Sequence, residues 1–432
     1  MVRRHRHTLD NGLRVVTLEQ PHLHRVSAVI YCRAGSRYES RKTNGLSHFV
    51  EHMIFRGTES HPDTTELHYA IESIGGSFHA ATHSDYTYYE ILMPPESLDA
   101  GMALLGEIIR EPRFERLELE KEIVREEIRG DLDEDGRDVN PDNLSREQLW
   151  PDHPLGFPIA GPLGNLDSFT LDDVRGFFRR HFVGANLVLC VTGPVGPEVV
   201  TRLAERDFAK LPRGEVAVPE AVRAAQTRPA YAHVVSDSSQ TEMRIAWRAI
   251  AETDPRNAAQ QLLVRLLDDG MATPLHRHIV DERGLVYEIT AALDPYQDTG
   301  VFDVAAAAQH DKVHEVLRLV LEMCVRLADA PPDPVELAKA KRRYRWELEA
   351  MVDDLLSLSG WFGAGELFED PQELGVWADK VDQVTPAEIQ ALAAAIFVPA
   401  NLNVFTVGLL GRRERKKVME LVARAGRPDA ES

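Results

Sequence analysis

The 432-residue sequence has only three cysteines, Cys32, Cys190 and Cys324, and no CxxC pair. An odd, scattered set of this kind excludes a disulfide framework and a thiolate zinc site. We therefore expect three buried free thiols.

The sequence also lacks a long apolar run and an excess of basic residues. No window approaches the length of a membrane span, and the N-terminus has no apolar segment of signal-peptide length. Lys and Arg number 49 against 69 Asp and Glu, and the resulting net charge of −20 argues against nucleic-acid binding. We expect a soluble cytoplasmic protein, or a periplasmic or secreted one if a leader was removed before residue 1.

The second half of the chain repeats part of the first. The segment FTLDDVRGFFRRHFVGANLVLCVTG (169–193) aligns without a gap with VTPAEIQALAAAIFVPANLNVFTVG (384–408), 215 residues later. Each copy predicts a helix with a Thr N-cap, a short turn and a strand that ends in Gly. So long a period indicates a duplicated domain rather than a solenoid unit.

The duplication predicts two homologous α+β domains, each with helices packed on an antiparallel-rich sheet. Residues 213–230 are rich in Pro, Ala and charge, which is typical of a linker. We therefore expect an N-terminal domain at 1–212 and a C-terminal domain at 231–432.

The segment GLSHFVEHMIFRGT (45–58) predicts a helix that carries a metal-binding face. His48 and His52 are four residues apart, so both imidazoles can reach one ion. Glu51 lies between them in projection, where it can take a proton from the attacking water. The alternative is a solvated face opposite the apolar stripe of Leu46, Phe49, Val50 and Met53.

A second helix, RLELEKEIVREEIRG (116–130), offers the third ligand. Glu120 and Glu127 are seven apart and project along nearly one line, within an apolar stripe. Inward carboxylates are costly unless a cation or hydrogen bonds compensate them. The alternative is a rotated helix with both glutamates at the edge of the stripe. The stripe consists of Leu117, Ile123, Val124 and Ile128.

His48, His52 and Glu127 together form the donor set of a catalytic zinc ion with one position open for water. Glu51 would then act as base and later as proton donor. Glu120 is a candidate for orienting a ligand histidine. In the second half, QLLVRLLDDG stands where this motif would be, with Gln261, Val264 and Arg265 at the equivalent positions, so we expect one Zn²⁺ per chain.

With these motifs the chain resembles the M16 (pitrilysin-like, inverzincin) metallopeptidases, which have H-x-x-E-H followed at long range by Glu. The resemblance extends over DNGLRVV, AGSRYES, IESIGGSFHAATHSDYTYYE and DERGLVYEI. In size the chain is similar to the M16B branch, which includes mitochondrial processing peptidase and its bacterial relatives. The resemblance implies two LuxS/MPP-like domains, a dimer that encloses a chamber, and endopeptidase cleavage of peptides or unfolded segments.

The resemblance also implies where the substrate binds. A peptide would add to a sheet edge within SFHAATHSD, so the expected substrate contacts are His79, Ala80, Ala81 and Thr82. The family often has Asn where this chain has His79.

Active members usually carry an Arg and a Tyr seven residues apart that bind the substrate carbonyl or the oxyanion. The Tyr matches Tyr287, but Val280 stands at the Arg position, with Arg277 and Arg283 nearby. The chain therefore resembles the zinc-bearing subunit of a heterodimer whose homologous partner supplies the Arg/Tyr pair; a homodimer is the alternative. Tyr287 could also pack its ring in the core.

Two other functions remain open. One is a non-catalytic structural subunit, like the core proteins of respiratory complex III, which share this fold and usually have a degraded metal motif. The intact set of His48, Glu51, His52, Glu120 and Glu127 favours the enzyme. The other is a zinc-binding protein without hydrolytic activity.

Overall fold

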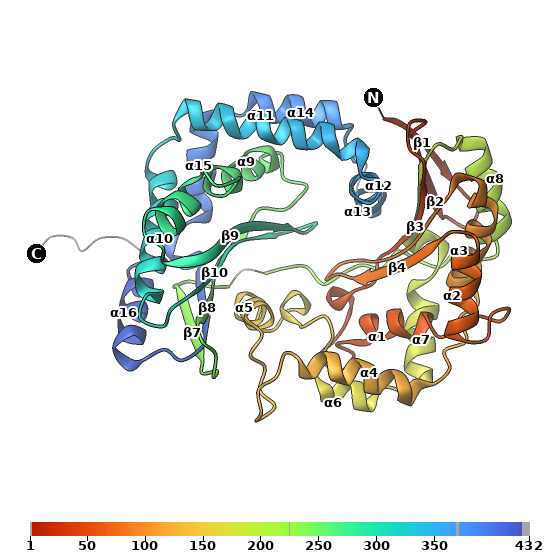
Figure 1. Ribbon diagram of the computed structural model, residues 1–432, viewed down its shortest axis with the longest axis horizontal. Coiled ribbons are helices and arrows are strands. Elements are labelled where there is room, and N and C mark those ends of the chain that lie inside the picture. Colours follow the sequence, from red (N-terminus) through yellow and green to blue (C-terminus); the bar gives the residue numbers. More distant parts are fainter. Residues whose placement is uncertain (1, 224, 369–370, 426–432) are drawn as a thin grey trace, which may run out of the picture. The chain divides into compact units, whose positions relative to one another are not determined.

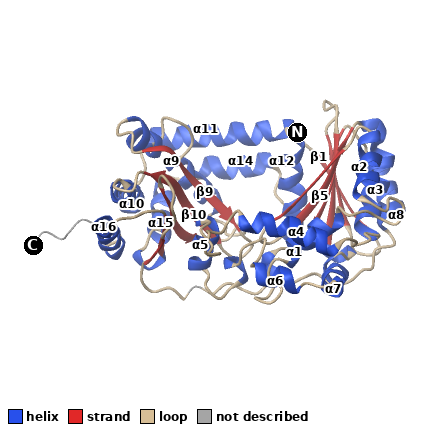
Figure 2. Cartoon of the chain, turned by 60° about the horizontal axis from the view of Figure 1, so that its bottom comes forward, coloured by secondary structure: helices blue, strands red, loops and turns tan. Residues whose placement is uncertain are grey.

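The computed structural model describes residues 2–223, 225–368 and 371–425, which form two compact units. The described residues within 1–130, 157–220 and 349–372 make up the first unit, and those within 131–156, 221–348 and 373–432 the second. Each unit is a sheet covered by helices (Figures 1 and 2). Among the described residues, no helix has both the length and the apolar composition that a membrane span requires.

The first unit has a six-stranded sheet in the order β1-β2-β6-β3-β5-β4. All neighbours are antiparallel except β2 and β6. Strands β3 and β6 lie in the middle and are buried along their whole length, as their near-continuous apolar runs VSAVIYC and LVLCVTG require. The strands are β1 (Arg3–Thr8), β2 (Arg14–Glu19), β3 (Val26–Cys32), β4 (Ser77–Thr82), β5 (Thr87–Met93) and β6 (Leu187–Gly193).

Helices cover both faces of this sheet. Helices α3 and α8 pack on one face, and α12 packs on β3 and β6 from the other. The α12 side is fixed by a hydrogen bond of 3.0 Å between Tyr31 Oη and Ser359 Oγ. The helices of the first unit are α1 (Leu46–Ile54), α2 (Thr64–Ser73), α3 (Leu98–Arg110), α4 (Leu117–Arg129), α6 (Leu163–Ser168), α7 (Leu171–His181), α8 (Pro197–Phe208), α12 (Leu355–Ser359) and α13 (Gly365–Phe368).

The second unit has a five-stranded sheet in the order β7-β11-β8-β10-β9, with one parallel pair, β7 and β11. Its strands are β7 (Ala230–Val234), β8 (Thr241–Ala249), β9 (Val286–Pro295), β10 (Gly300–Ala308) and β11 (Leu402–Val407). Its helices are α5 (Pro141–Leu149), α9 (Asn257–Leu267), α10 (Val313–Asp329), α11 (Pro334–Ala350, whose last two residues pass into the first unit), α14 (Leu374–Gln383), α15 (Pro386–Ile396) and α16 (Arg412–Ala423).

The two sheets have the same topology, since β7-β11-β8-β10-β9 repeats β2-β6-β3-β5-β4 strand for strand. The predicted repeat is confirmed in detail: Thr170 before α7 and Thr385 before α15 each form a capping box with the third helical residue. Helix α7 is followed by β6 and helix α15 by β11, and each of these strands belongs to the parallel pair of its sheet. The expected pair of homologous α+β domains is therefore present.

The units are not contiguous along the chain. The boundary between residues 220 and 221 falls within the expected linker, but residues 131–156 belong to the second unit and residues 349–372 to the first. In the second unit, α5 packs on β8 and β11, and Asp142 forms a two-point ion pair with Arg244 at 2.5 and 3.0 Å. A single boundary at 213–230 therefore does not account for these two segments, each of which belongs to the unit formed mainly by the other half of the chain.

All three cysteines are free and buried, as predicted. Burial raises the pKa of each thiol, in the case of Cys190 to about 11. A thiol with such a pKa is protonated at neutral pH and is a poor nucleophile.

Candidate metal centre

Helix α1 begins one residue later than predicted because a glutamate outside the helix caps it. The Glu39 carboxylate accepts hydrogen bonds from the backbone N–H groups of Gly45 (2.9 Å) and Ser47 (2.6 Å). The Asn44 side-chain amide also donates to Glu39, at 3.1 Å. Burial raises the pKa of Glu39, and these hydrogen bonds oppose the rise. Gly45 has φ 96°, and a Cβ there would lie 2.5 Å from Ala160 O, so only glycine fits.

Helix α1 is buried on nearly all sides, which excludes a solvated face. His48 is 8% exposed and Glu51 9%, while His52 is partly buried. Polar groups at this depth need partners, and the partners come from α4 and β4.

Helix α4 is rotated relative to the predicted apolar stripe. Glu120 and Val124 are buried, as expected, but Ile123 is 43% exposed and does not belong to the stripe. The Glu127 side chain is half exposed at the edge of the buried face. Glu120 therefore lies inside the unit, whereas Glu127 reaches the histidines from the rim.

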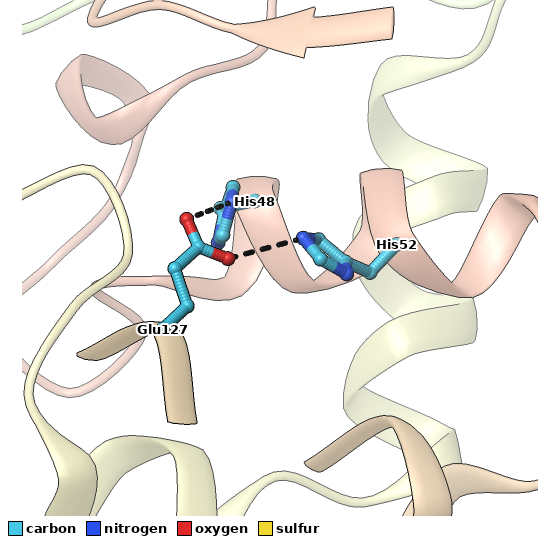
Figure 3. Close-up of side chains that lie close together, drawn as sticks. All are labelled: His48, His52 and Glu127. Atoms are coloured by element: carbon cyan, nitrogen blue, oxygen red, sulfur yellow. Dashed lines mark ion pairs between the residues drawn. The ribbon is translucent and has the colours of Figure 1, made fainter. Parts of the chain in front are cut away.

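His48, His52 and Glu127 converge. Glu127 Oε1 lies 3.4 Å from His48 Nε2, and Glu127 Oε2 lies 3.5 Å from His52 Nε2. Figure 3 shows the carboxylate with one oxygen turned towards each ring. Tetrahedral zinc, with bonds of about 2.0–2.1 Å, separates its donor atoms by roughly 3.3 Å. Among the described residues, this is the one group of three or more such side chains whose donor atoms lie within 4.8 Å of one another.

The side chains around His48, His52 and Glu127 carry an excess of negative charge, which favours a bound cation. Three carboxylates lie at or next to the two histidines, namely Glu51, Glu120 and Glu127. One guanidinium, that of Arg56, donates to Glu120. Burial lowers the pKa of His52, but its hydrogen bonds to Glu120 and Glu127 outweigh this and raise that pKa to about 9. Hydrogen bonds from the two histidines hold the pKa of Glu127 well below its usual range. A divalent cation would supply the positive charge that the histidines otherwise provide, so the donor set fits zinc.

The neighbours of the cluster orient its donors. Glu120 Oε1 lies 2.9 Å from His52 Nδ1, which leaves Nε2 directed at Glu127. A carboxylate behind a histidine fixes the tautomer and the direction of the ring. Arg56 was not recognised from the sequence; its position four residues after His52, in the turn that follows α1, was the available signal.

Glu51 is held by the strand at the sheet edge. Thr82 Oγ1 donates a hydrogen bond of 2.7 Å to Glu51 Oε2. Thr82 ends β4, which among the described strands pairs with β5 alone and forms one edge of the sheet. Ala80 and Ala81 are partly exposed on this strand, and His79 is exposed with Nε2 3.2 Å from Ser77 Oγ.

Tyr287 belongs to the second unit. It lies on β9, the edge strand of that sheet, and is 93% exposed, which excludes the alternative of a ring packed in the core. Val280 lies in a π-helical segment, His276–Asp281, just before it. Nearby, Arg277 and Arg283 both pair with Glu282. The catalytic role of Tyr287 stays a prediction.

The three donors could hold a metal ion, and comparison with known proteins gives the family of the chain. The model of the insulinase family (peptidase family M16) matches residues 14–163, and that of the M16 inactive domain matches residues 168–344. The chain is 31% identical over 349 residues to an uncharacterized zinc protease of Rickettsia felis, covering 79% of this chain and 82% of that protein. The chain therefore belongs to the M16 peptidase family.

The chain is also similar to other proteins at lower sequence identity. An uncharacterized zinc protease of Streptomyces coelicolor is 26% identical over 97% of this chain and 92% of its own length. A probable mitochondrial-processing peptidase subunit beta of Arabidopsis thaliana is 27% identical over 80% of this chain and 67% of its own length. A protease from Helicobacter pylori has the same fold, with a TM-score of 0.89 at 20% identity over 94% of this chain and all of that structure.

Proposed function

We propose that the chain is a zinc-dependent endopeptidase with one zinc ion per chain. The convergence of His48, His52 and Glu127, with Glu51 beside them, carries the proposal. When bound, zinc acts as a Lewis acid that polarises the scissile carbonyl and lowers the pKa of water towards neutrality.

The residues of the chain then divide the work. Glu51 takes the proton from the attacking water and later gives it to the leaving amine. Thr82 holds the Glu51 carboxylate in one orientation, and Glu120, itself paired with Arg56, holds His52. Because Glu51 and His52 are already oriented, the reaction does not have to pay the entropy of ordering these side chains.

The substrate would be an extended peptide or an unfolded segment. Strand β4 leaves its outer edge unpaired, and a peptide that adds there places its backbone beside the strand that ends at Thr82. His79, Ala80 and Ala81 would lie along this peptide. Most strands of a folded protein are already paired within their own sheet, so folded proteins would be poor substrates.

We further propose that the active form is a dimer that encloses a chamber, and that the partner is a homologous M16 subunit with an Arg/Tyr pair. Val280 at the usual Arg position supports this, as does similarity to a relative named as a beta subunit. A homodimer that uses Tyr287 is the alternative.

The test is hydrolysis of a mixture of quenched peptides by the zinc-loaded chain, alone and with an added Arg/Tyr-bearing homologue. Glu51→Gln should keep its zinc and lose hydrolysis, since Gln cannot accept the proton. Glu118→Gln, an exposed neighbour on α4, is the control that should retain it. Hydrolysis by Glu51→Gln would contradict the role of Glu51.

A second candidate is a non-catalytic structural subunit of the same fold. The match of residues 168–344 to a domain model described as inactive favours it. Zinc binding without hydrolysis in either form of the assay would support this candidate over the enzyme.

A further inference from the structure

Helix α9 of the second unit is the counterpart of the metal-binding helix α1. The buried apolar residues of α1 recur in α9 at a constant spacing of 213 residues: Leu46, Phe49, Val50, Met53 and Ile54 correspond to Ala259, Leu262, Leu263, Leu266 and Leu267. At this spacing Gln261 stands in the place of His48, and Arg265 in the place of His52.

Helix α11 is the counterpart of α4. Lys121 on α4 donates to Asp167 O at 3.1 Å, and Lys341 on α11 donates to Asp382 O at 2.8 Å. The spacing between the two lysines is 220 residues. It also relates buried Val124 and Ile128 to buried Tyr344 and Leu348. At this spacing the position of the ligand Glu127 is taken by another glutamate, Glu347.

The second unit thus retains one carboxylate of the site, and an arginine faces it. Arg265 Nη2 lies 2.8 Å from Glu347 Oε2, and Nη1 lies 3.8 Å from Asp269 Oδ1. The guanidinium stacks on Tyr344, with its carbon 4.1 Å from the ring centroid. The Arg265 side chain is only 14% exposed and Asp269 10%, whereas Glu347 reaches the pair from the surface with its side chain 56% exposed.

The second unit also has one cationic side chain between two carboxylates, although Asp269 stands at the position of Arg56 and Ala340 at that of Glu120. In the first unit His52 lies between Glu120 and Glu127. In the second unit Arg265 lies between Asp269 and Glu347. The guanidinium is permanently charged and can stack on an aromatic face, so it compensates a carboxylate without any bound ion.

We propose that the Arg265 guanidinium takes the place of the metal ion in the second unit. Histidines at positions 261 and 265 would then complete, with Glu347, a binding site for a divalent transition metal. Positions 261 and 265 lie one helical turn apart, as His48 and His52 do. Two histidines there would join Glu347 in the same donor set of two imidazoles and one carboxylate.

The test is made in a chain without the first site, His48→Ala/His52→Ala, so it does not depend on the proposed peptidase activity. Zinc per chain after dialysis should be zero in this background and about one after Gln261→His/Arg265→His are added. Cobalt(II) in place of zinc should give the visible absorption of a tetrahedral site. Adding Glu347→Gln should weaken zinc binding at least about tenfold.

Zinc uptake that is unaffected by Glu347→Gln would overturn the proposal, as would no uptake by a folded chain; circular dichroism reports folding. If the variant with Gln261→His and Arg265→His does not fold, the role of Arg265 is tested by thermal unfolding of variants without new histidines. Arg265→Met should lower Tm because Glu347 loses its cation, whereas Asp269 keeps its ion pair with Arg343 at 2.9 Å. Arg265→Met/Glu347→Gln should recover part of the loss, whereas Arg265→Lys should lose less. Equal Tm for Arg265→Met and the wild type would contradict the compensating role.

Discussion

Thr82 Oγ1 donates a hydrogen bond of 2.7 Å to Glu51 Oε2, so the last residue of the edge strand orients the carboxylate that lies beside both histidines. The cross-strand neighbour Thr87 is buried, and its Oγ1 lies 3.4 Å from Thr82 Oγ1 while donating to Ala34 O. The edge expected to receive a peptide and the expected base are therefore in direct contact.

Loss of this hydrogen bond should slow hydrolysis without weakening peptide binding. Thr82→Val removes the hydroxyl at nearly constant volume. A hydrogen bond to a charged group contributes about 1.5–3 kcal/mol, so kcat should fall roughly 10- to 100-fold with little change in KM. Steady-state kinetics on one cleaved peptide would measure both. Thr82→Ser should retain activity. A change confined to KM in Thr82→Val would instead make Thr82 a substrate contact.

The carboxylate behind His52 should govern metal affinity. Glu120→Gln keeps the shape of the side chain but loses the charge that orients His52 and pairs with Arg56. Zinc affinity should fall about 10- to 100-fold, as measured by competition with a chelator of known affinity. The exposed Glu118→Gln on the same helix is the matched control. Equal affinity in the two variants would show that Glu120 does not support the ligand.

The cap on α1 should stabilise the first unit. Glu39→Ala leaves the buried N–H groups of Gly45 and Ser47 without their acceptor. An unsatisfied buried donor costs about 1–3 kcal/mol, so the free energy of unfolding should fall by roughly 2–6 kcal/mol for the two donors. Denaturant unfolding would measure this loss. Glu39→Gln, which keeps one acceptor oxygen, should lose less; the exposed Glu72→Ala on α2 is the control.

His181 should make stability depend on pH. Burial lowers its pKa to about 4, although its Nδ1 lies 3.0 Å from Arg33 O. Because the folded pKa lies below the ordinary value of 6.5, the unfolded chain binds the proton first. The contribution to stability is therefore complete above pH 6.5 and is lost as the pH falls from 6.5 to about 4, by up to about 3 kcal/mol. The difference in unfolding free energy between wild type and His181→Asn, followed from pH 7.5 to 4.5, measures this. A difference that stays constant would contradict a neutral buried His181.

Much of the site could be predicted from the sequence because it depends on spacing within helices. His48 and His52 lie one turn apart in any α-helix, and α4 presents Glu120 and Glu127 along one line once it forms. The repeat likewise predicted two homologous units, since Thr170 and Thr385 begin equivalent helices. The predicted stripe of α4 was wrong at Ile123, because which side of a helix is covered depends on its neighbours rather than on its own periodicity.

The sequence by itself determined the donor set, the duplicated architecture and the absence of a second H-x-x-E-H motif. Only the tertiary structure decided that Glu39 caps α1, that Thr82 holds Glu51 and that Arg265 faces Glu347. It also decided that residues 131–156 and 349–372 join the opposite units. The physical reason is range: turns and helical faces follow from neighbouring residues, whereas these contacts join residues far apart along the chain and exist only once the sheets and helices have packed.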